Sequence, residues 1–370
     1  MTFRPDPQSA DKSGETADTL GDAAMTGLGL VGAGKWGGNW LRTLAGMSGV
    51  DLRWCCDLNE ALLAKVRDAH PDVSTTSHFD DLLRDPATEG VVIASIAPTH
   101  FPLAKKALEA GKHVLVEKPM TLTTADATAL NRVADRAGRV LMVGHLMEYH
   151  PAIPAIRRLI QSGEIGEVRR IESRRTNHGT LRTDENVWWS FAPHDISIAV
   201  RLMGEWPEAV HCDGQCLVQP RVADVVGGTL RFPGNRVARI DVSWHDPAKV
   251  RELKVYGTKK WVVFDDSLPW DRKVLVHDRG FDVNPTASPT QRITMRLGGV
   301  KALALDPTEP LVAEARHFVD CIRTGARPLS DGVAGAAVVS VLECGQLSLT
   351  SGREVALPPF EAERPIRRAA

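Results

Sequence analysis

The chain has 370 residues and carries 45 lysines and arginines against 46 aspartates and glutamates. This length is enough for two domains of ordinary size with a substantial core. The balanced charge, without a basic block or stripe, argues against nucleic acid or an anionic membrane surface as a partner. No apolar run approaches the ~20 residues of a membrane span. We therefore expect a cytoplasmic protein.

The two ends of the chain are expected to form tails. Residues 1–26 are polar and acidic and lack the apolar segment of a signal peptide. This composition is typical of disorder, and Met25 is an alternative start of translation. Residues 358–370 are expected to form a C-terminal tail. The six cysteines include no CxxC pair, so the sequence predicts reduced core cysteines and no metal site.

Short β-type runs alternate with amphipathic stretches between Gly27 and Gly144. This alternation predicts a parallel, doubly wound α/β sheet with helices on its faces. The predicted strands cover residues 27–32, 50–57, 91–95, 113–117 and 139–144. The predicted helices cover residues 35–47, 60–68, 102–110 and 124–137.

A glycine-rich motif, GAGKWG, follows the first predicted strand and opens the first predicted helix. Gly32 permits a tight turn, Gly34 lets the backbone approach a pyrophosphate, and Gly37 lets the helix pack closely on the strand. Asp57 ends the second predicted strand, where its carboxylate would bind ribose hydroxyls and repel the 2′-phosphate of NADP. The pattern predicts an NAD-binding Rossmann domain over residues 27–145. The alternative is a glycine-rich turn without a ligand.

Residues 113–121, HVLVEKPMT, predict a buried strand that ends on Glu117 and Lys118. Ligands bind at the carboxyl ends of the strands in a doubly wound sheet. Lys118 is therefore expected near the nicotinamide end of the cofactor, where burial can lower its pKa and let it donate or accept a proton. The alternative is a surface lysine paired with Glu117.

These segments resemble the glucose–fructose oxidoreductase/inositol dehydrogenase/MocA family. The resemblance extends from Gly27 to about Leu357 and rests on GAGKWG, APTH, ALEAGKHVLVEKPMTLT, VLMVGH, PHD and EARHFVDCIRTGARPLSDG. It implies a dehydrogenase in which Lys118 touches both the substrate and the nicotinamide. The cofactor contacts expected on these grounds are Gly32, Gly34, Lys35, Trp36, Gly37, Asp57, Ala97, Pro98, His100, Glu117 and Lys118.

The second half of the chain is rich in alternating β-type segments, including residues 167–178 and a hairpin around Pro233-Gly234-Asn235. We expect an α+β domain over residues 146–357 with a large, mostly antiparallel open-faced sheet. Helices near residues 311–324 and 332–351 should close the chain. One face of such a sheet needs cover, so the expected assembly is a homodimer or homotetramer.

The segment DENVWWSFAPHDISIAVRLMG predicts a helix from near Pro193 to Gly204, with His194 in its first turn and facing the cleft between the domains. The resemblance implies an Asp-x-x-x-His pair at this place, but Ser190 stands at the position of the Asp. Asp195 is predicted to point about 100° around the helix from His194, so it is no obvious replacement.

Two residues are assigned to catalysis. His194 has an ordinary pKa that suits proton abstraction from a hydroxyl at neutral pH. Lys118 is the cation expected to steady the developing alkoxide, although burial beside the nicotinamide would reverse the two roles if it lowered the lysine pKa far enough. The alternative for His194 is a helix-terminal histidine that binds only backbone.

The run ESRRTNHGTLRTDENVWWSFAPHDIS is most similar to the branch of the family that oxidises C3 of UDP-N-acetylglucosamine-type sugars. A nucleotide sugar needs cations for its diphosphate or carboxylate, and arginines precede the predicted catalytic helix. In a strand, Arg175 and Asn177 share one face and Arg174 the other. A solvated face is the alternative for any one of these arginines. The expected substrate contacts are Lys118, His145, Tyr149, Arg175, Asn177, Arg182 and His194.

Three functions are weighed. The first is NAD-dependent oxidation of a nucleotide sugar at C3. The second keeps the fold and the cofactor but acts on a free sugar, inositol or a sugar phosphate. The third is an NAD-binding regulator of another protein; Lys118 and His194 argue against it, and Ser190 keeps it open.

Overall fold

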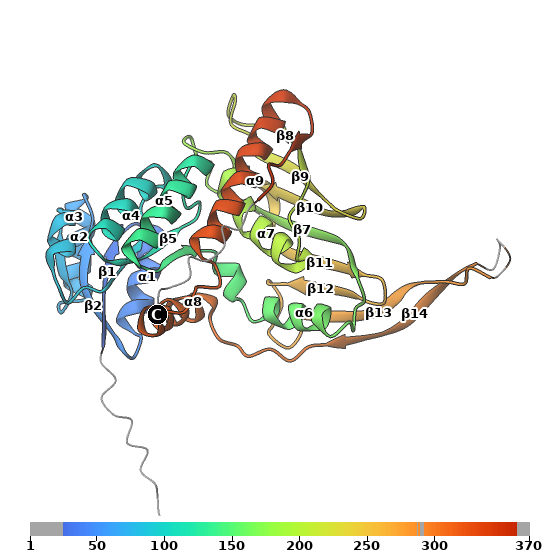
Figure 1. Cartoon of the computed structure of the whole chain (residues 1–370), viewed down its shortest axis with the longest axis horizontal. Coiled ribbons are helices and arrows are strands. Elements are labelled where there is room, and N and C mark those ends of the chain that lie inside the picture. Colours follow the sequence, from blue (N-terminus) through green and yellow to red (C-terminus); the bar gives the residue numbers. More distant parts are fainter. Residues whose placement is uncertain (1–24, 287, 289–291, 361–370) are drawn as a thin grey trace, which may run out of the picture.

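The computed structural model describes residues 25–286, 288 and 292–360. It contains two β-sheets, with helices on their faces (Figure 1). The predicted tails, 1–26 and 358–370, lie outside the described residues except at their inner ends.

The first sheet has six strands in the order β3-β2-β1-β4-β5-β6, and its strand pairs are parallel. The chain runs outward from β1 to β3 and then returns to β4, so the strand order reverses between β1 and β4. The carboxyl ends of these two strands border the switch point at which doubly wound sheets bind ligands. The predicted parallel sheet is confirmed. Its strands are β1 (Thr26–Val31), β2 (Val50–Cys56), β3 (Ser74–Thr76), β4 (Gly90–Ile93), β5 (His113–Glu117) and β6 (Leu141–Gly144).

Helices cover both faces of this sheet (Figure 1). One apolar cluster joins the sheet to α1, α2 and α8, and another joins it to α3, α4, α5 and the start of α9. The late helix α8 therefore returns to the first sheet after the chain has passed through the second. The helices are α1 (Lys35–Ala45), α2 (Glu60–Ala69), α3 (Phe79–Arg84), α4 (His100–Glu109), α5 (Thr124–Ala137), α8 (Pro310–Thr324) and α9 (Gly332–Ser351).

The second sheet has nine strands in the order β14-β13-β12-β11-β7-β10-β9-β8-β15. Among its described pairs, only β7 and β10 run parallel, so the predicted mostly antiparallel sheet is confirmed. Its strands are β7 (Val168–His178), β8 (Ala209–Gln215), β9 (Val225–Phe232), β10 (Arg236–Ser243), β11 (His245–Gly257), β12 (Trp261–Asp265), β13 (Val274–Val283), β14 (Ile293–Ala302) and β15 (Val355–Ala356).

The predicted hairpin joins β9 to β10. Arg236 pairs with Phe232 at its closed end, and the turn places Gly234 and Asn235 at φ +73° and +58°. Both values lie in the left-handed region that glycine and asparagine adopt readily. The alternating apolar residues of β10, including Ile240, are buried on the face that carries helices.

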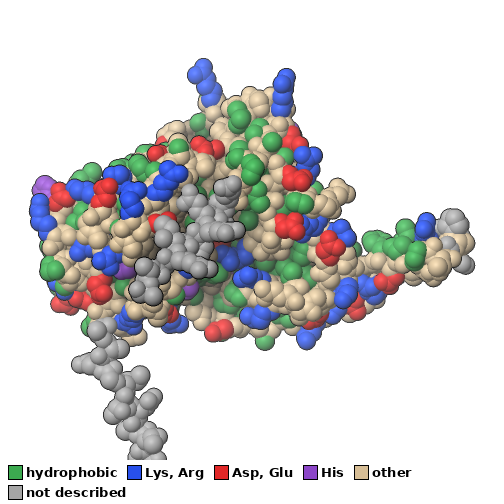
Figure 2. Space-filling view, in the orientation of Figure 1, with side chains coloured by type: hydrophobic (Ala, Val, Ile, Leu, Met, Phe, Trp, Pro, Cys, Tyr) green, Lys and Arg blue, Asp and Glu red, His purple; other side chains and the backbone are tan. Residues whose placement is uncertain are grey.

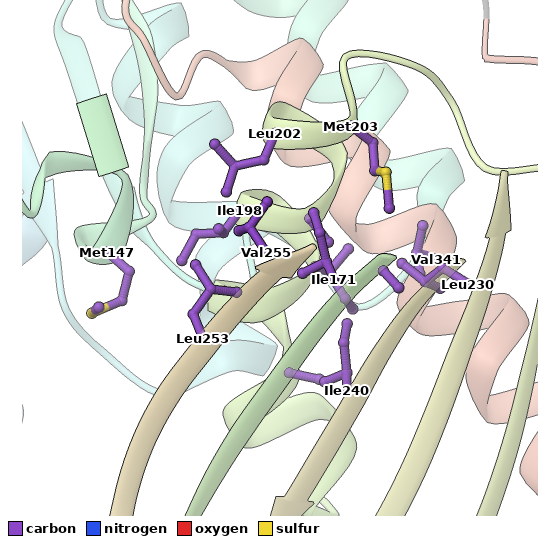
Figure 3. Close-up of a cluster of buried hydrophobic side chains, with 14 of the residues drawn as sticks. Met147, Ile171, Ile198, Leu202, Met203, Leu230, Ile240, Leu253, Val255 and Val341 are labelled. Atoms are coloured by element: carbon purple, nitrogen blue, oxygen red, sulfur yellow. The ribbon is translucent and has the colours of Figure 1, made fainter. Parts of the chain in front are cut away.

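Helices α6 (Ala152–Gln161), α7 (Val187–Met203) and α9 pack on one face of the second sheet. Figure 3 shows the resulting core: apolar side chains of β7, β9, β10 and β11 meet those of α7 and α9. The labelled residues of this cluster are Met147, Ile171, Ile198, Leu202, Met203, Leu230, Ile240, Leu253, Val255 and Val341.

Helix α9 is long and apolar enough to cross a membrane by length and composition, a feature that the sequence prediction missed. More than half of its apolar window is buried within the protein. The helix contacts both α5 and α7, as expected for a core helix that links the two sheets.

Strands β13 and β14 form a hairpin that projects from the rest of the molecule (Figure 1). Strand β14 was not predicted. Its residue Met295 pairs with Phe281, and both side chains are mostly exposed. Figure 2 shows hydrophobic side chains on this projecting hairpin.

Candidate active site

The glycine-rich loop joins β1 to α1 at the carboxyl edge of the first sheet. Gly32 has φ +96°, which favours glycine, and a Cβ on Gly37 would lie 1.9 Å from the Gly32 carbonyl oxygen. A Cβ on Gly34 would meet no atom within 4 Å. Gly34 is the N-cap of α1, without a side-chain cap, and the first turn holds no acidic residue. The N-terminal N–H groups of α1 thus border open space, where an anionic group fits.

Asp57 lies directly beside this loop. Its Oδ2 accepts a hydrogen bond from Ala33 N at 2.6 Å, and its Oδ1 accepts one from Asn59 N at 2.8 Å. The carboxylate therefore lies at the end of β2 next to the glycine-rich loop, as the motif predicts. These residues fit an adenosine ribose beside a diphosphate.

Glu117 ties the glycine-rich helix to β5. The indole N–H groups of Trp36 and Trp40 both donate to Glu117 Oε1, the Trp40 bond measuring 2.7 Å. Burial raises the pKa of the Glu117 carboxyl. Because α1 engages its carboxylate, Glu117 orients Trp36 and Trp40; its contact with the cofactor stays a prediction. The Lys35 side chain stays exposed beside the loop.

His100 lies between two loops at the carboxyl edge of the first sheet. It is buried, with Nδ1 at 2.8 Å from Pro119 O and Nε2 at 3.0 Å from Ser95 O. The ring therefore links the loop after β4 to the loop after β5 and positions both, and its contact with the cofactor stays a prediction. Ala97 and Pro98 lie in the short 3-10 helix of that first loop, at the carboxyl end of β4.

Lys118 follows β5 and contacts α7. Its Nζ donates a hydrogen bond to Ser190 O at 2.9 Å. Burial lowers the pKa of Lys118, while Glu117 and Glu185 raise it. Ser190, at the family position of an aspartate, thus offers this lysine a backbone carbonyl.

Helix α7 begins at Val187, earlier than predicted, and Pro193 lies inside it. The side chain of Asn186 accepts a hydrogen bond from Trp189 N at 3.2 Å and caps the helix. Proline is common in a first helical turn, which explains the wrong prediction. His194 therefore lies in the middle of α7 and not in its first turn.

His194 and His145 lie close enough for charge on one to lower the pKa of the other. Burial, followed by Arg175 and Lys118, lowers the pKa of His194 well below its ordinary 6.5. Burial also lowers the pKa of His145, to about 3. Nδ1 of His194 and both ring nitrogens of His145 are buried and have no hydrogen-bond partner among the described residues.

Tyr149 does not join these histidines. Its side chain is buried, and its hydroxyl lies 2.8 Å from Ser330 Oγ. It belongs to the apolar cluster that joins α8 to the first sheet. Tyr149 therefore has a packing role, and its contact with the substrate stays a prediction.

Arg175 is buried and forms a paired contact with Asp195, from Nε at 2.7 Å and from Nη2 at 3.1 Å. Asp195 thus binds Arg175 and, as predicted, does not replace the missing partner of His194. Arg182 is half-exposed and lies 2.8 Å from Glu185. Asn177 has a buried Oδ1 without a partner among the described residues.

Two segments of the chain match models of one known protein family. Residues 26–145 match the oxidoreductase family with an NAD-binding Rossmann fold, and residues 153–263 match the GFO/IDH/MocA C-terminal domain. The chain belongs to this family. It is thus an NAD-binding, sugar-type oxidoreductase, and the glycine-rich loop and Asp57 lie within the matched NAD-binding segment.

Relatives of the chain act on several sugars. D-apiose dehydrogenase from Paraburkholderia graminis is 25% identical, over 91% of each chain. UDP-N-acetylglucosamine 3-dehydrogenase from Acidithiobacillus ferrooxidans is 28% identical over 68% of this chain and 76% of the relative. A solved structure of a UDP-N-acetylglucosamine 3-dehydrogenase from the same species has a TM-score of 0.75 at 25% identity, covering 88% of this chain and 97% of that one.

The sequence analysis missed two charged residues near Lys118 and His194. Arg251 of β11 stands opposite Arg175 in the strand register and lowers the pKa of His194. Glu185, which precedes α7, raises the pKa of Lys118. Strand alternation alone does not say which residues of two distant strands become neighbours, so no sequence signal identified Arg251.

The described residues contain no cluster of His, Cys, Asp or Glu that could hold a metal ion. A hollow of about 400 Å³ lies at the outer edge of the NAD-binding sheet, away from Lys118. Within it, Arg53 is paired with Asp51 and Asp85. Both of its arginines, Arg53 and Arg84, are paired with acids, and neither Lys118 nor His194 lines it, so it is no candidate for the substrate site.

Proposed function

We propose that this family member oxidises a secondary alcohol of a sugar to a ketone and that Lys118 and His194 carry out the proton chemistry. The observation that carries the proposal is the contact between Lys118 Nζ and Ser190 O, at 2.9 Å. This contact joins the carboxyl end of β5, in the NAD-binding sheet, to the helix that holds His194. It supports a single site between the two sheets.

Each residue has a distinct task in this proposal. When bound, NAD supplies the hydride acceptor. His194 is neutral at pH 7, because burial and nearby cations lower its pKa, and it accepts the hydroxyl proton. Lys118 keeps N–H donors with which it steadies the alkoxide. Helix α7 positions both groups, because it contains His194 and its Ser190 carbonyl accepts a hydrogen bond from Lys118.

We propose C3 of a UDP-N-acetylglucosamine-type sugar as the reacting carbon. Two things support it: the similarity to a UDP-N-acetylglucosamine 3-dehydrogenase, and the cations around the histidines. The cations Lys118, Arg175, Arg182 and Arg251 outnumber the acids Glu117, Glu185 and Asp195 by four to three. Such a surplus favours an anionic substrate.

A substrate panel tests this function. NADH formation is measured with UDP-N-acetylglucosamine, UDP-N-acetylglucosaminuronate, glucose, glucose 6-phosphate and inositol. UDP-sugars should have the highest kcat/KM. His194→Asn should lower kcat by ~10²–10⁴-fold, which is the usual contribution of a general base. The affinity for NADH should change little. Lys118→Met should raise the sugar KM and lower kcat.

Other outcomes of this panel point to the alternatives. Turnover of glucose or inositol in preference to both UDP-sugars would change the substrate but keep the reaction. Tight NAD binding without turnover of any sugar would contradict the enzymatic proposal and favour an NAD-binding regulator. Near-normal turnover by His194→Asn with an inactive Lys118→Met would make Lys118 the base.

We also propose that the protein acts in the cytoplasm, as a homo-oligomer. All six cysteines are free in the structure, and four of them are buried. A reducing compartment keeps such cysteines in this form. The proposed domains, 27–145 and 146–357, would meet near His145.

A further inference from the structure

Arg251 is a half-buried cation whose neighbouring acids are already used. Its Nη1 donates to the carbonyl oxygens of Thr176 and Val250, at 2.9 and 2.8 Å. Its guanidinium lies 5.3 Å from the centre of the Phe191 ring. No ion pair joins Arg251 to a carboxylate within the part of the chain that the structure describes.

Asp195 and Asp266 are the two acids whose charges raise the pKa of Arg251. Asp195 receives both bonds from Arg175, and Asp266 pairs with Lys273 at 2.7 Å. Burial and Arg175 lower the pKa of Arg251 to about 10. Burying a cation without a paired anion costs free energy. A bound anion would offset part of this cost.

The other cations of the site are less available. Arg175 donates two hydrogen bonds to Asp195, and Arg182 is half-exposed and paired with Glu185. Arg251 makes hydrogen bonds only through Nη1 among the described residues, which leaves Nε and Nη2 for a ligand.

Unpartnered polar atoms of the proposed site are a second observation that points to a ligand. Arg251 lies over the ring of Phe191, which precedes His194 by three residues in α7, and its charge lowers the pKa of His194. His194 Nδ1 and both nitrogens of His145 are buried without partners, and the His145 side chain is only 1% exposed. Buried polar atoms are normally hydrogen-bonded, so a polar molecule is expected to fill this place.

We propose that Arg251 binds an anionic group on the sugar, a carboxylate or a phosphoryl oxygen, and thereby selects charged sugars over neutral ones. This rests on the proposed function, because it places the sugar hydroxyl between Lys118 and His194. Arginine presents parallel N–H groups that match either oxyanion, and the stacked Phe191 ring holds the guanidinium plane in place.

The test compares Arg251→Met with a matched control, Arg174→Met. Arg174 is a residue of β7 like Arg175, but it lies on the opposite face, half-exposed and 2.9 Å from Asp246. Both variants lose one positive charge. Binding of UDP-N-acetylglucosaminuronate, UDP-N-acetylglucosamine and N-acetylglucosamine to the NADH-loaded protein is measured by calorimetry.

Arg251→Met should bind its anionic ligand about 10- to 100-fold more weakly than wild type, as expected for the loss of a charged hydrogen bond. Arg174→Met should match wild type. If Arg251→Met binds both UDP-sugars equally more weakly, Arg251 contacts the phosphoryl groups. If only binding of the uronate is weakened, Arg251 contacts its carboxylate. Arg251→Lys should restore part of the affinity, and unchanged NADH binding by each variant checks folding.

Three results with the variants would overturn the proposal. They are unchanged affinity of Arg251→Met for both UDP-sugars, an equal loss for neutral N-acetylglucosamine, and an equal loss in Arg174→Met. If wild type binds neither UDP-sugar, glucuronate and inorganic phosphate replace them as probes in thermal-shift assays at constant ionic strength. Failure of both to stabilise NADH-loaded wild type also overturns it. The proposed function fails separately, when anions bind but no sugar reduces NAD.

Discussion

His145 and His194 bury three ring nitrogens that have no partner among the described residues, whereas His100 places both of its nitrogens against carbonyl oxygens. This difference separates histidines that are available to a ligand from one that holds two loops together. Glu117 resembles His100 in this respect, because two indole N–H groups engage its carboxylate. Partners, more than residue type, therefore distinguish positioning groups from candidate catalytic groups.

The pH profile tests the assignment of the base. A histidine base must be neutral, and the pKa of His194 is lowered well below 6.5 by burial and by Arg175 and Lys118. The neutral form therefore persists as the pH falls through 6.5. We expect kcat/KM for sugar oxidation to hold at pH 6.5 and to decline only at lower pH. An acid limb centred above pH 6.5 in steady-state rates would contradict this assignment.

Asp57 is expected to set the cofactor preference. Its carboxylate lies beside the glycine-rich loop, 2.6 Å from Ala33 N, where it would repel a 2′-phosphate. Asp57→Ala should weaken NAD binding and raise the relative kcat/KM with NADP. Steady-state rates with both cofactors measure the ratio, and an unchanged ratio would show that Asp57 does not contact the ribose.

At the scale of elements, local signals predicted most of the fold. Many of the strands and helices between Gly27 and Gly144 have glycine or proline at one end, and the hairpin at Pro233-Gly234-Asn235 has a strong turn signal. The start of α7 was wrong because Pro193 is inside the helix. Strands β3 and β14 and helices α3 and α6 were missed, since short or weakly alternating segments depend on their neighbours.

The candidate site shows the same limit. Lys118 and the glycine-rich loop follow from their places at strand ends, but Arg251 is brought to Arg175 by strand register. Register depends on the whole sheet and not on the local sequence. The domain boundary near His145 stays a prediction, and α8 packs on the first sheet although it follows the second.

The packing of α9 on α7 can be tested at one glycine. A Cβ on Gly345 would lie 2.5 Å from Nε1 of Trp188, which is fully buried and also packs on Gly228. Gly345→Val should destabilise the protein by about 1–3 kcal/mol through overpacking. Thermal or urea unfolding measures the change.

Gly38 of α1 supplies the control for this substitution. It is exposed at the end of the first turn of α1, and a Cβ there would meet no atom within 4 Å. Gly38→Ala should therefore stabilise the apo protein by about 0.5–1 kcal/mol through helix propensity. Stabilisation by Gly345→Val would show that the α7–α9 contact is looser than described.

At the scale of the whole molecule, the β13–β14 hairpin has one apolar face and one polar face. Arg296 pairs with Asp278 on the polar face. The other face carries the exposed apolar side chains Phe281, Val283, Ile293, Met295 and Leu297. Phe281 pairs with Met295 and Val283 with Ile293, while Leu297 pairs with Arg279. An exposed apolar strand pair at a sheet edge is expected to be covered, and a second copy of the chain is the proposed partner.

The combined substitutions Met295→Glu and Leu297→Glu should lower the mass measured by light scattering during size-exclusion chromatography. Thr294→Glu, on the opposite face, is the control and should keep the wild-type mass. A monomeric wild type, or an equal effect of the control, would rule out this surface as the interface.

The central claim is that hydride leaves a sugar carbon for the nicotinamide in a site built around Lys118 and His194. UDP-N-acetylglucosaminuronate deuterated at C3 tests it most directly, with NMR of the nicotinamide product. We predict deuterium at C4 of the reduced nicotinamide with wild type and a strongly reduced rate of its appearance with His194→Asn. Reduced nicotinamide without deuterium would contradict C3 as the reacting carbon, and no reduced nicotinamide with any sugar would contradict the claim as a whole.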